Sequence, residues 1–452
     1  MDIEFIKVGS ILLTFIVIIY FFKKNDEFLI ILAFFFLSTG LNRYSTIIKG
    51  DLDWVRVNYA YSIFSLDDTL ALEALNLFFW GTITFTLSYV FFNSENKRIA
   101  YKHIDDNNFF RKFLDKKKPL IIYLFVLFII INSFTAVILK GAENIAYGNS
   151  YFFLFGLAIG GIFLLIFMIY RKLDFKNNLL LKSLLLIILI YSAILSYNPT
   201  LRFQFLSWMI ALGYLILKDA SPMKKARLYI VGGFVLIIFF SLAGVARYQN
   251  LNSLSWDEKY YLALERATAT EDQNMLDGFM MVLQVYPQEL EYHYGMEHLE
   301  ILMRPIPRAL WPSKPVGGYA NKLGLNDAEK GTVGISQTIY GTFYGEGGIL
   351  GILIFSITYG YFFVKLFRYA NRYSSDMKYL LRGIILASVI PILRGGDIPG
   401  IIAFIGMSYW PIFLILYQYN KYLKIKPVSE NKCPHPQKYN LTRIQSTYSE
   451  PQ

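Results

Sequence analysis

The sequence predicts an all-α polytopic membrane protein with about eleven transmembrane helices and one large loop outside the membrane late in the chain. Three observations predict this class. Of the 452 residues, 55% are hydrophobic and only 17% are charged, and the mean hydropathy is +0.40. Apolar runs of about 20 residues recur along the chain. The basic residues gather in short segments between these runs, whereas a soluble domain would carry more charge throughout.

The first apolar run, residues 6–22, is interpreted as a membrane span and not as a cleaved signal peptide. Asp2 and Glu4 precede it, and no small-residue cleavage site follows. A lipid-exposed backbone must satisfy its own hydrogen bonds, so each span is expected to be a helix. The further predicted spans are residues 28–42, 70–92, 119–139, 151–170, 179–197, 203–217, 228–246, 349–367, 379–393 and 398–419.

Basic clusters at every second connection set the predicted orientation. They begin with Lys23 and Lys24 and continue at residues 97–118, 171–176, 218–227, 368–378 and 421–426. Lys and Arg accumulate on the cytoplasmic side of a membrane. We therefore predict a bacterial inner-membrane protein with its N-terminus outside and its C-terminus in the cytoplasm. The same interpretation accounts for the net charge of +11 without nucleic acid as a partner.

The spans divide the chain into four parts. Residues 1–247 hold the first eight spans, 248–348 form the large outer loop, 349–423 hold the last three spans, and 424–452 form a polar cytoplasmic tail that is predicted to be disordered. Loops of about 100 residues are usually functional. Helices that lie over the bundle are expected at residues 257–286. The single cysteine, Cys433, lies in the tail, so no disulfide framework is predicted.

Residues 304–315 of the loop, RPIPRALWPSKP, contain four prolines in twelve residues. Proline fixes φ and prevents a regular helix, so a stiff extended segment is expected here. It would present Arg304, Arg308, Trp311 and Lys314 in fixed directions, which suits a ligand with fixed negative charges. The alternative is a solvated basic turn at the membrane surface.

Three further arginines, Arg202, Arg247 and Arg394, are predicted at the outer ends of spans. That side of the membrane should be poor in arginine. Guanidinium groups bind phosphate oxygens bidentately and keep their proton, so a shared pyrophosphate at the edge of the bilayer would account for all three. For each arginine alone, the alternative is snorkelling to lipid headgroups.

The candidate acid and base groups of the large loop are Glu289, Glu291, His293, Glu297, His298 and Glu300. Either histidine could deprotonate a sugar hydroxyl as a general base, and a surface histidine is the alternative for each. The two histidines are five residues apart, so a helix would not place them on one face, and no zinc site is predicted.

Two other motifs are candidate sites. Asp51 and Asp53 form a D-x-D in the first outer loop, which could hold a divalent cation or form a polar turn. Residues 341–351, GTFYGEGGILG, have glycine at five of eleven positions, which allows tight turns and close helix approach. That stretch could bury Glu346, or it could be a flexible re-entry into the next span.

Together these features resemble the Wzy-type oligosaccharide repeat unit polymerases, of the O-antigen and capsule polymerase group. The resemblance rests on the order of features over most of the chain. About eleven helices, with arginines at outer ends, lead to a large late loop. In that loop DGFMMVLQVYP is followed by YHYGMEHLEILMRPIPRALWPSKP and then GTFYGEGGILG, and ILRGGD lies near the end of the chain.

The resemblance implies a membrane glycosyltransferase similar to the GT-C class that works without a metal or other cofactor. A growing glycan on undecaprenyl pyrophosphate would be transferred en bloc to a new lipid-linked repeat unit. A chain-length regulator and a flippase are candidate partners. An O-antigen ligase with the same donor, and a lipid-linked oligosaccharide flippase or transporter, remain alternatives.

The resemblance also implies roles for particular residues. The predicted pyrophosphate-binding residues are Arg202, Arg247, Arg304, Arg308 and Arg394. Lys314 is a further substrate-binding candidate, from its place in the proline-rich stretch and not from the resemblance. Arg308 is also a catalytic candidate, because charge that develops on the leaving pyrophosphate must be stabilised. The acceptor must lose a proton, and the resemblance transfers no base for it, so His293 and His298 stay catalytic candidates from their chemistry alone.

Overall fold

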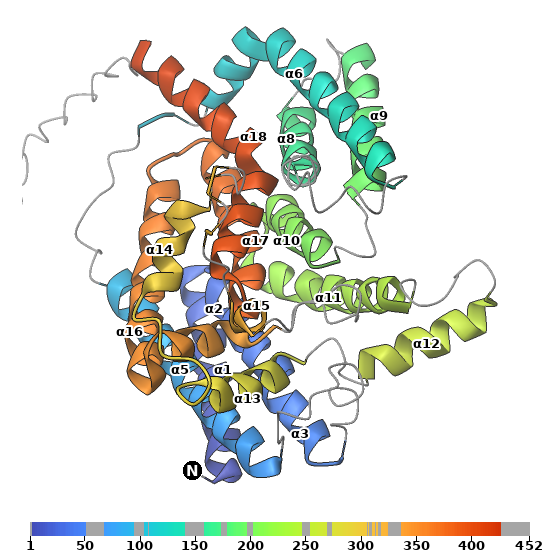
Figure 1. Cartoon of the computed structure of the whole chain (residues 1–452). Coiled ribbons are helices and arrows are strands. Elements are labelled where there is room, and N and C mark those ends of the chain that lie inside the picture. The colour runs from blue at the N-terminus through green and yellow to red at the C-terminus, as the bar shows by residue number, and fades with distance from the viewer. Residues whose placement is uncertain are drawn as a thin grey trace, which may run out of the picture.

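A computed structural model of the chain describes residues 2–50, 67–94, 104–106, 108–140, 158–172, 179–196, 202–245, 254–268, 274–304, 306, 310–311, 313–314, 318–323 and 336–425. Within these ranges every regular element is a helix (Figure 1). The predicted all-α class is confirmed for this part of the chain.

Five helical segments are long and apolar enough to cross a bilayer within the described ranges. The first is α1 (Ile3–Lys24), and the second joins α2 (Phe28–Phe36), the π-helix η1 (Leu37–Asn42) and α3 (Arg43–Ile47). The others are α5 (Asp68–Ser94), α16 (Thr338–Asn371) and α18 (Ile398–Ile425). The chain is therefore a multi-pass membrane protein.

The described parts of the other predicted spans fall on helices as well. These helices are α6 (Phe109–Lys140), α8 (Ile159–Lys172), α9 (Leu179–Ser196), α10 (Arg202–Leu217), α11 (Pro222–Val245) and α17 (Asp376–Arg394). The total of about eleven spans stays a prediction. The large loop contributes α12 (Trp256–Thr268), α13 (Met275–Val285), α14 (Met296–Met303) and α15 (Tyr319–Lys322).

Aromatic packing and small residues hold α2, α5 and α16 together. The ring of Phe28 stacks on Tyr89 at a centroid distance of 4.5 Å and lies 4.7 Å from the ring of Phe363. A Cβ atom at Gly360 would lie 2.6 Å from the hydroxyl oxygen of Ser88, so glycine permits this close approach of α16 to α5. Small residues serve the same purpose between membrane helices in general.

The loop helix α13 is part of the core and does not lie over the bundle. Its residues are buried against α5 and α16. Its acidic residue, Asp277, forms a bidentate ion pair with Arg43 of α3, with distances of 2.8 Å from Nε to Oδ1 and 2.6 Å from Nη2 to Oδ2. Both side chains are only 1% exposed. This pair fixes the start of the large loop to the N-terminal helices.

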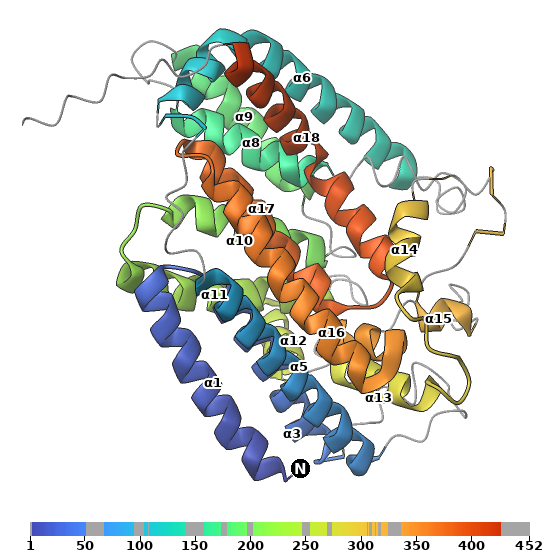
Figure 2. The same ribbon diagram turned by 90° about the vertical axis from the view of Figure 1, so that its left-hand side faces the viewer.

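Contacts between connections group the ends of the helices. Lys225 at the start of α11 binds Glu27 before α2 (Nζ to Oε1, 2.8 Å), and Lys218 after α10 binds Asp376 at the start of α17 (2.6 Å). All four lie in connections that are predicted to be cytoplasmic. Figure 2 shows α14 and α15 near the opposite end of α17, where α16 begins. The two ion pairs join connections that are predicted to lie on the same side of the membrane, so they fit the predicted alternation of helix direction. Which side faces the cytoplasm stays a prediction.

Reporter fusions can decide this orientation. A topology reporter fused after Lys118 should report the cytoplasm, and one inserted within residues 257–348 should report the outside, because the basic clusters mark the cytoplasmic connections. Fluorescence and phosphatase reporters at the two positions provide the measurement. If both positions report the same side, the predicted topology is wrong.

Candidate functional site

The glycine-rich stretch breaks α16 at a point next to the large loop. Gly347 (φ 173°, ψ 35°) and Gly348 (φ 63°, ψ −143°) depart from helical geometry, and the positive φ of Gly348 favours glycine. The break leaves the carbonyl of Gly345 to accept the His293 N–H at 3.0 Å, and that of Glu346 to accept the next N–H at 2.8 Å. The stretch is therefore a fixed turn that receives the loop.

Glu346, at this break, is buried and binds the start of α14. Its Oε2 accepts the backbone N–H of Gly295 at 2.6 Å, and its Oε1 lies 2.6 Å from Nδ1 of His298. The other ring nitrogen of His298 lies 3.1 Å from the hydroxyl of Tyr359, and the ring stacks on Phe355 at 4.3 Å. Both ring nitrogens are thus engaged. The catalytic role of His298 stays a prediction, and the geometry favours a role in holding α14 against α16.

His293 lies on the other side of the same turn. Its Nε2 is 2.9 Å from the hydroxyl of Tyr286 and 2.6 Å from Nζ of Lys322 on α15. Burial, followed by the charge of Lys322, lowers the pKa of His293. A lowered pKa favours the neutral imidazole that a general base requires, but two donors already surround this nitrogen. The catalytic role of His293 also stays a prediction.

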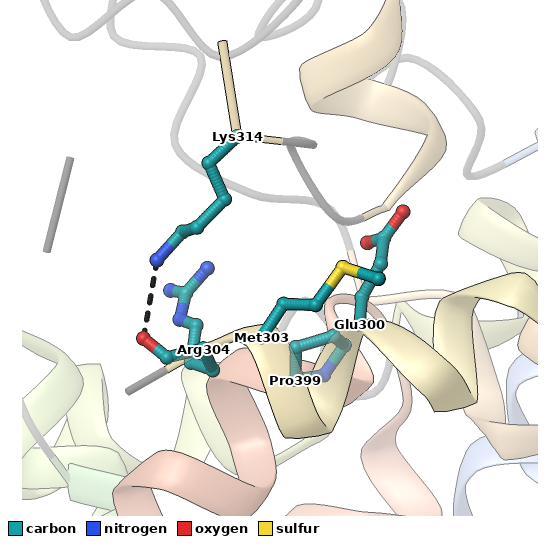
Figure 3. Close-up of a pocket in the computed structure, with 5 residues that line it drawn as sticks. All are labelled: Glu300, Met303, Arg304, Lys314 and Pro399. Atoms are coloured by element: carbon teal, nitrogen blue, oxygen red, sulfur yellow. Dashed lines mark hydrogen bonds between the residues drawn. The ribbon is translucent and has the colours of Figure 1, made fainter. Parts of the chain in front are cut away.

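A small pocket lies where α14 meets the connection between α17 and α18. It is shallow and open to the surroundings, and it is lined by Glu300, Met303, Arg304, Lys314 and Pro399. Figure 3 shows the Arg304 and Lys314 side chains on one side and the Glu300 carboxyl group on the other, with Met303 and Pro399 between them. Two cations and one carboxyl group therefore face a shared space.

Lys314 shows how the proline-rich stretch is folded. Its Nζ donates to the backbone carbonyls of Arg304 at 3.1 Å and Ile306 at 2.7 Å. Ten residues in an extended chain would span roughly 33 Å, so the two ends could not meet. The prediction of an extended segment is therefore wrong, because Lys314 lies next to Arg304 and Ile306. These contacts fix the position of the Lys314 ammonium group beside the start of the stretch.

Pro399 at the start of α18 lines the pocket, and the connection between α17 and α18 lies next to it. Asp397 in this connection pairs with Arg304 at 3.4 Å (Oδ2 to Nη2), and the N–H of Ile398 donates to Oε1 of Glu297 at 3.2 Å. Burial is the main cause that raises the pKa of Glu297 to about 8. At neutral pH its carboxyl group is therefore mostly protonated, which suits its position beneath the pocket.

The structure brings some of the predicted site residues together. Arg304 and Lys314 share the pocket, and Arg394 ends α17 three residues before Asp397. Arg202 begins α10, but its side chain is not described. The predicted roles of Arg247 and Arg308, and of the D-x-D at Asp51 and Asp53, fall outside the described residues.

Sequence reasoning missed two members of this region, Lys322 and Asp397, and could not assign a third, Glu300, to the pocket. Lys322 belongs to no motif, and only the fold brings it to His293. Asp397 ends the ILRGGD motif, but its pairing with Arg304 depends on the position of α14. Glu300 was one of several candidate acids, and its place in the pocket had no sequence signal. The local signals that point to this region are the proline-rich stretch with Arg304 and Lys314, and the carboxylate of Glu346 flanked by glycines.

The chain was compared with protein-family models, curated proteins and solved structures, and none of them matches. Within the described ranges, no group of three or more His, Cys, Asp and Glu residues is placed to hold a metal ion. The site is therefore interpreted from its own geometry and from the sequence.

Proposed function

We propose that this protein is a membrane glycosyltransferase that polymerises undecaprenyl-pyrophosphate-linked repeat units on the outer face of a bacterial inner membrane. The observation that carries the proposal is the pocket in which Arg304 and Lys314 face Glu300 at an end of the helix bundle. A glycosyl transfer from a pyrophosphate needs fixed positive charge at the leaving group and an acceptor for one proton.

The two cations suit a pyrophosphate better than a neutral sugar. Arg304 offers a planar guanidinium group that can bind two phosphate oxygens, and Lys314 adds a point charge held by backbone carbonyls. The pocket is too small for a whole oligosaccharide, so the sugars and the lipid tail would extend from its open mouth. The lipid tail would remain in the bilayer that surrounds the apolar helices.

The wider architecture is compatible with the proposal. Eleven spans in a GT-C-like arrangement, with the N-terminus outside, would place the pocket on the outer side. A ligase would use the same donor, and only the acceptor separates the two activities. A flippase is supported less, because the charged groups of the pocket lie at a helix end, whereas transporter sites lie near the middle of the membrane.

Reconstitution of the purified protein with a synthetic lipid-linked repeat unit tests this proposal. Polymers of two or more units should form without any other protein, and activity should persist in EDTA because guanidinium and ammonium groups supply the positive charge. Mass spectrometry of the lipid-extracted products gives the number of units. If EDTA abolishes the activity and magnesium restores it, a metal ion supplies the positive charge, and Asp51 and Asp53 are the first candidate ligands.

A further inference from the structure

The pocket holds a carboxyl group whose bonding is incomplete. Glu300 lies on α14 one turn before Arg304, and Figure 3 shows its carboxyl group across the pocket from the guanidinium group of Arg304. Its Oε2 atom is buried and has no hydrogen-bond partner among the described residues. A buried polar oxygen without a donor costs free energy of folding, so it is expected where a ligand supplies the donor.

The other acid and base candidates near this position are less suited to receive a proton. Both ring nitrogens of His298 are bonded, to Glu346 and Tyr359. The Nε2 atom of His293 already lies within 2.9 Å of two donors. Glu300, in contrast, lines the pocket and keeps one carboxyl oxygen without a partner among the described residues.

We propose that Glu300 is the general base that activates the acceptor hydroxyl, an inference that rests on the proposed glycosyl transfer. The acceptor hydroxyl gives its proton to Glu300 while its oxygen attacks the anomeric carbon of the donor sugar. The bond between that carbon and the pyrophosphate oxygen breaks, and its electron pair leaves with the lipid pyrophosphate. The proton then passes from Glu300 to water.

The arrangement of the pocket fits a direct displacement. The base lies on one side and the cations that stabilise the leaving group lie on the other (Figure 3). Attack from the side opposite the leaving group inverts the configuration at the anomeric carbon. The glycosidic bond in the product should therefore have the opposite anomeric configuration to the donor.

The surroundings of Glu300 determine its basicity. The charged groups that face it are Lys322, Asp397, Glu346, Arg304 and Lys314. Burial is the largest cause that raises the pKa of Glu300, and the charge of Lys322 is the strongest influence that lowers it. A raised pKa makes the carboxylate a better base near neutral pH. Activity should fall as the pH decreases through this pKa, because the protonated group cannot accept a proton.

Replacement of Glu300 in the purified full-length protein tests the assignment. Glu300→Gln keeps the size of the side chain, and it should lower kcat by about 10²- to 10⁴-fold while KM for the lipid-linked donor stays within a few-fold. The acidic limb of the pH profile should disappear from the residual activity. Glu300→Asp should restore part of kcat. Glu265→Gln, at an exposed glutamate of α12 in the same loop, is the matched control and should retain wild-type activity.

The outcomes separate this inference from the proposed function. If the wild-type protein polymerises and folded Glu300→Gln keeps its kcat and its pH profile, Glu300 is not the base, although the proposed function stands. If KM rises with kcat unchanged, Glu300 only binds substrate, and the assignment is again wrong. If the wild-type protein forms no polymer from any lipid-linked repeat unit, the proposed function fails and this inference fails with it.

Discussion

Replacing the buried Arg43 by alanine is expected to destabilise the protein strongly. The change would leave the carboxylate of Asp277 without its bidentate partner in a position that is 1% exposed. Breaking a buried ion pair by removal of one partner costs about 3–5 kcal/mol. The apparent melting temperature in detergent should fall by on the order of 5 °C or more.

Two variants serve as controls for this prediction. The double substitution of Arg43→Met with Asp277→Leu removes both charges, so it should recover most of the lost stability. Lys7→Ala removes one partner of an exposed pair with Glu4 and should change stability by less than about 1 kcal/mol. If Arg43→Ala melts at the wild-type temperature, the ion pair does not fix α13 to the bundle.

Among changes that remove a contact to the leaving group, Arg304→Ala is expected to cause the largest loss of activity. A hydrogen bond to a charged group contributes about 1.5–3 kcal/mol, so its loss in the transition state should slow polymerisation roughly 10- to 100-fold. Arg304→Lys should recover little, because lysine keeps the charge but lacks the planar fork. Initial rates with the lipid-linked repeat unit provide the measurement.

The exposed Arg111 of α6 is a matched control, since it lies in a connection that is predicted to be cytoplasmic. Its alanine and lysine variants should polymerise at wild-type rates. Wild-type rates for Arg304→Ala would remove this residue from the pyrophosphate site. Full rescue by Arg304→Lys would instead indicate a simple point charge, or an arginine that only contacts headgroups.

The sequence predicted the helices well because the membrane constrains them so strongly. A run of apolar residues in lipid has to be helical, so the predicted spans could be placed without knowledge of their neighbours. The burial of α13 was not predicted. The helix is mostly apolar, but it also carries Asp277. The carboxylate can be buried only because it pairs with Arg43, which comes from a distant segment of the chain.

The site was predicted in part and for a physical reason. Proline and glycine have strong local effects, so residues 304–315 and 341–351 could be selected as special stretches. The path of the first stretch depends on bonds from Lys314 to backbone carbonyls, which no local pattern contains, and the expected extended form was wrong. The pocket needs α14, the α17–α18 connection and Lys314 together, so only the fold could assign Glu300 to it.

The histidines show the same limit. Their spacing could not be tested as a helical pattern, because His293 precedes α14 and His298 lies within it. It could not show that Lys322 would bind the first and Glu346 the second. A sequence pattern can select residues that are able to act as acids or bases. The groups that contact the ring nitrogens of these two histidines come from other segments, so the pattern does not contain them.

The central claim is polymerisation, and the surface glycan of a strain that lacks the gene tests it most directly. Gel electrophoresis of this glycan should show that the long ladder is lost while a single repeat unit is retained, and a plasmid copy of the wild-type gene should restore the ladder. Loss of every repeat unit from the glycan core would contradict the claim and indicate a ligase or a flippase.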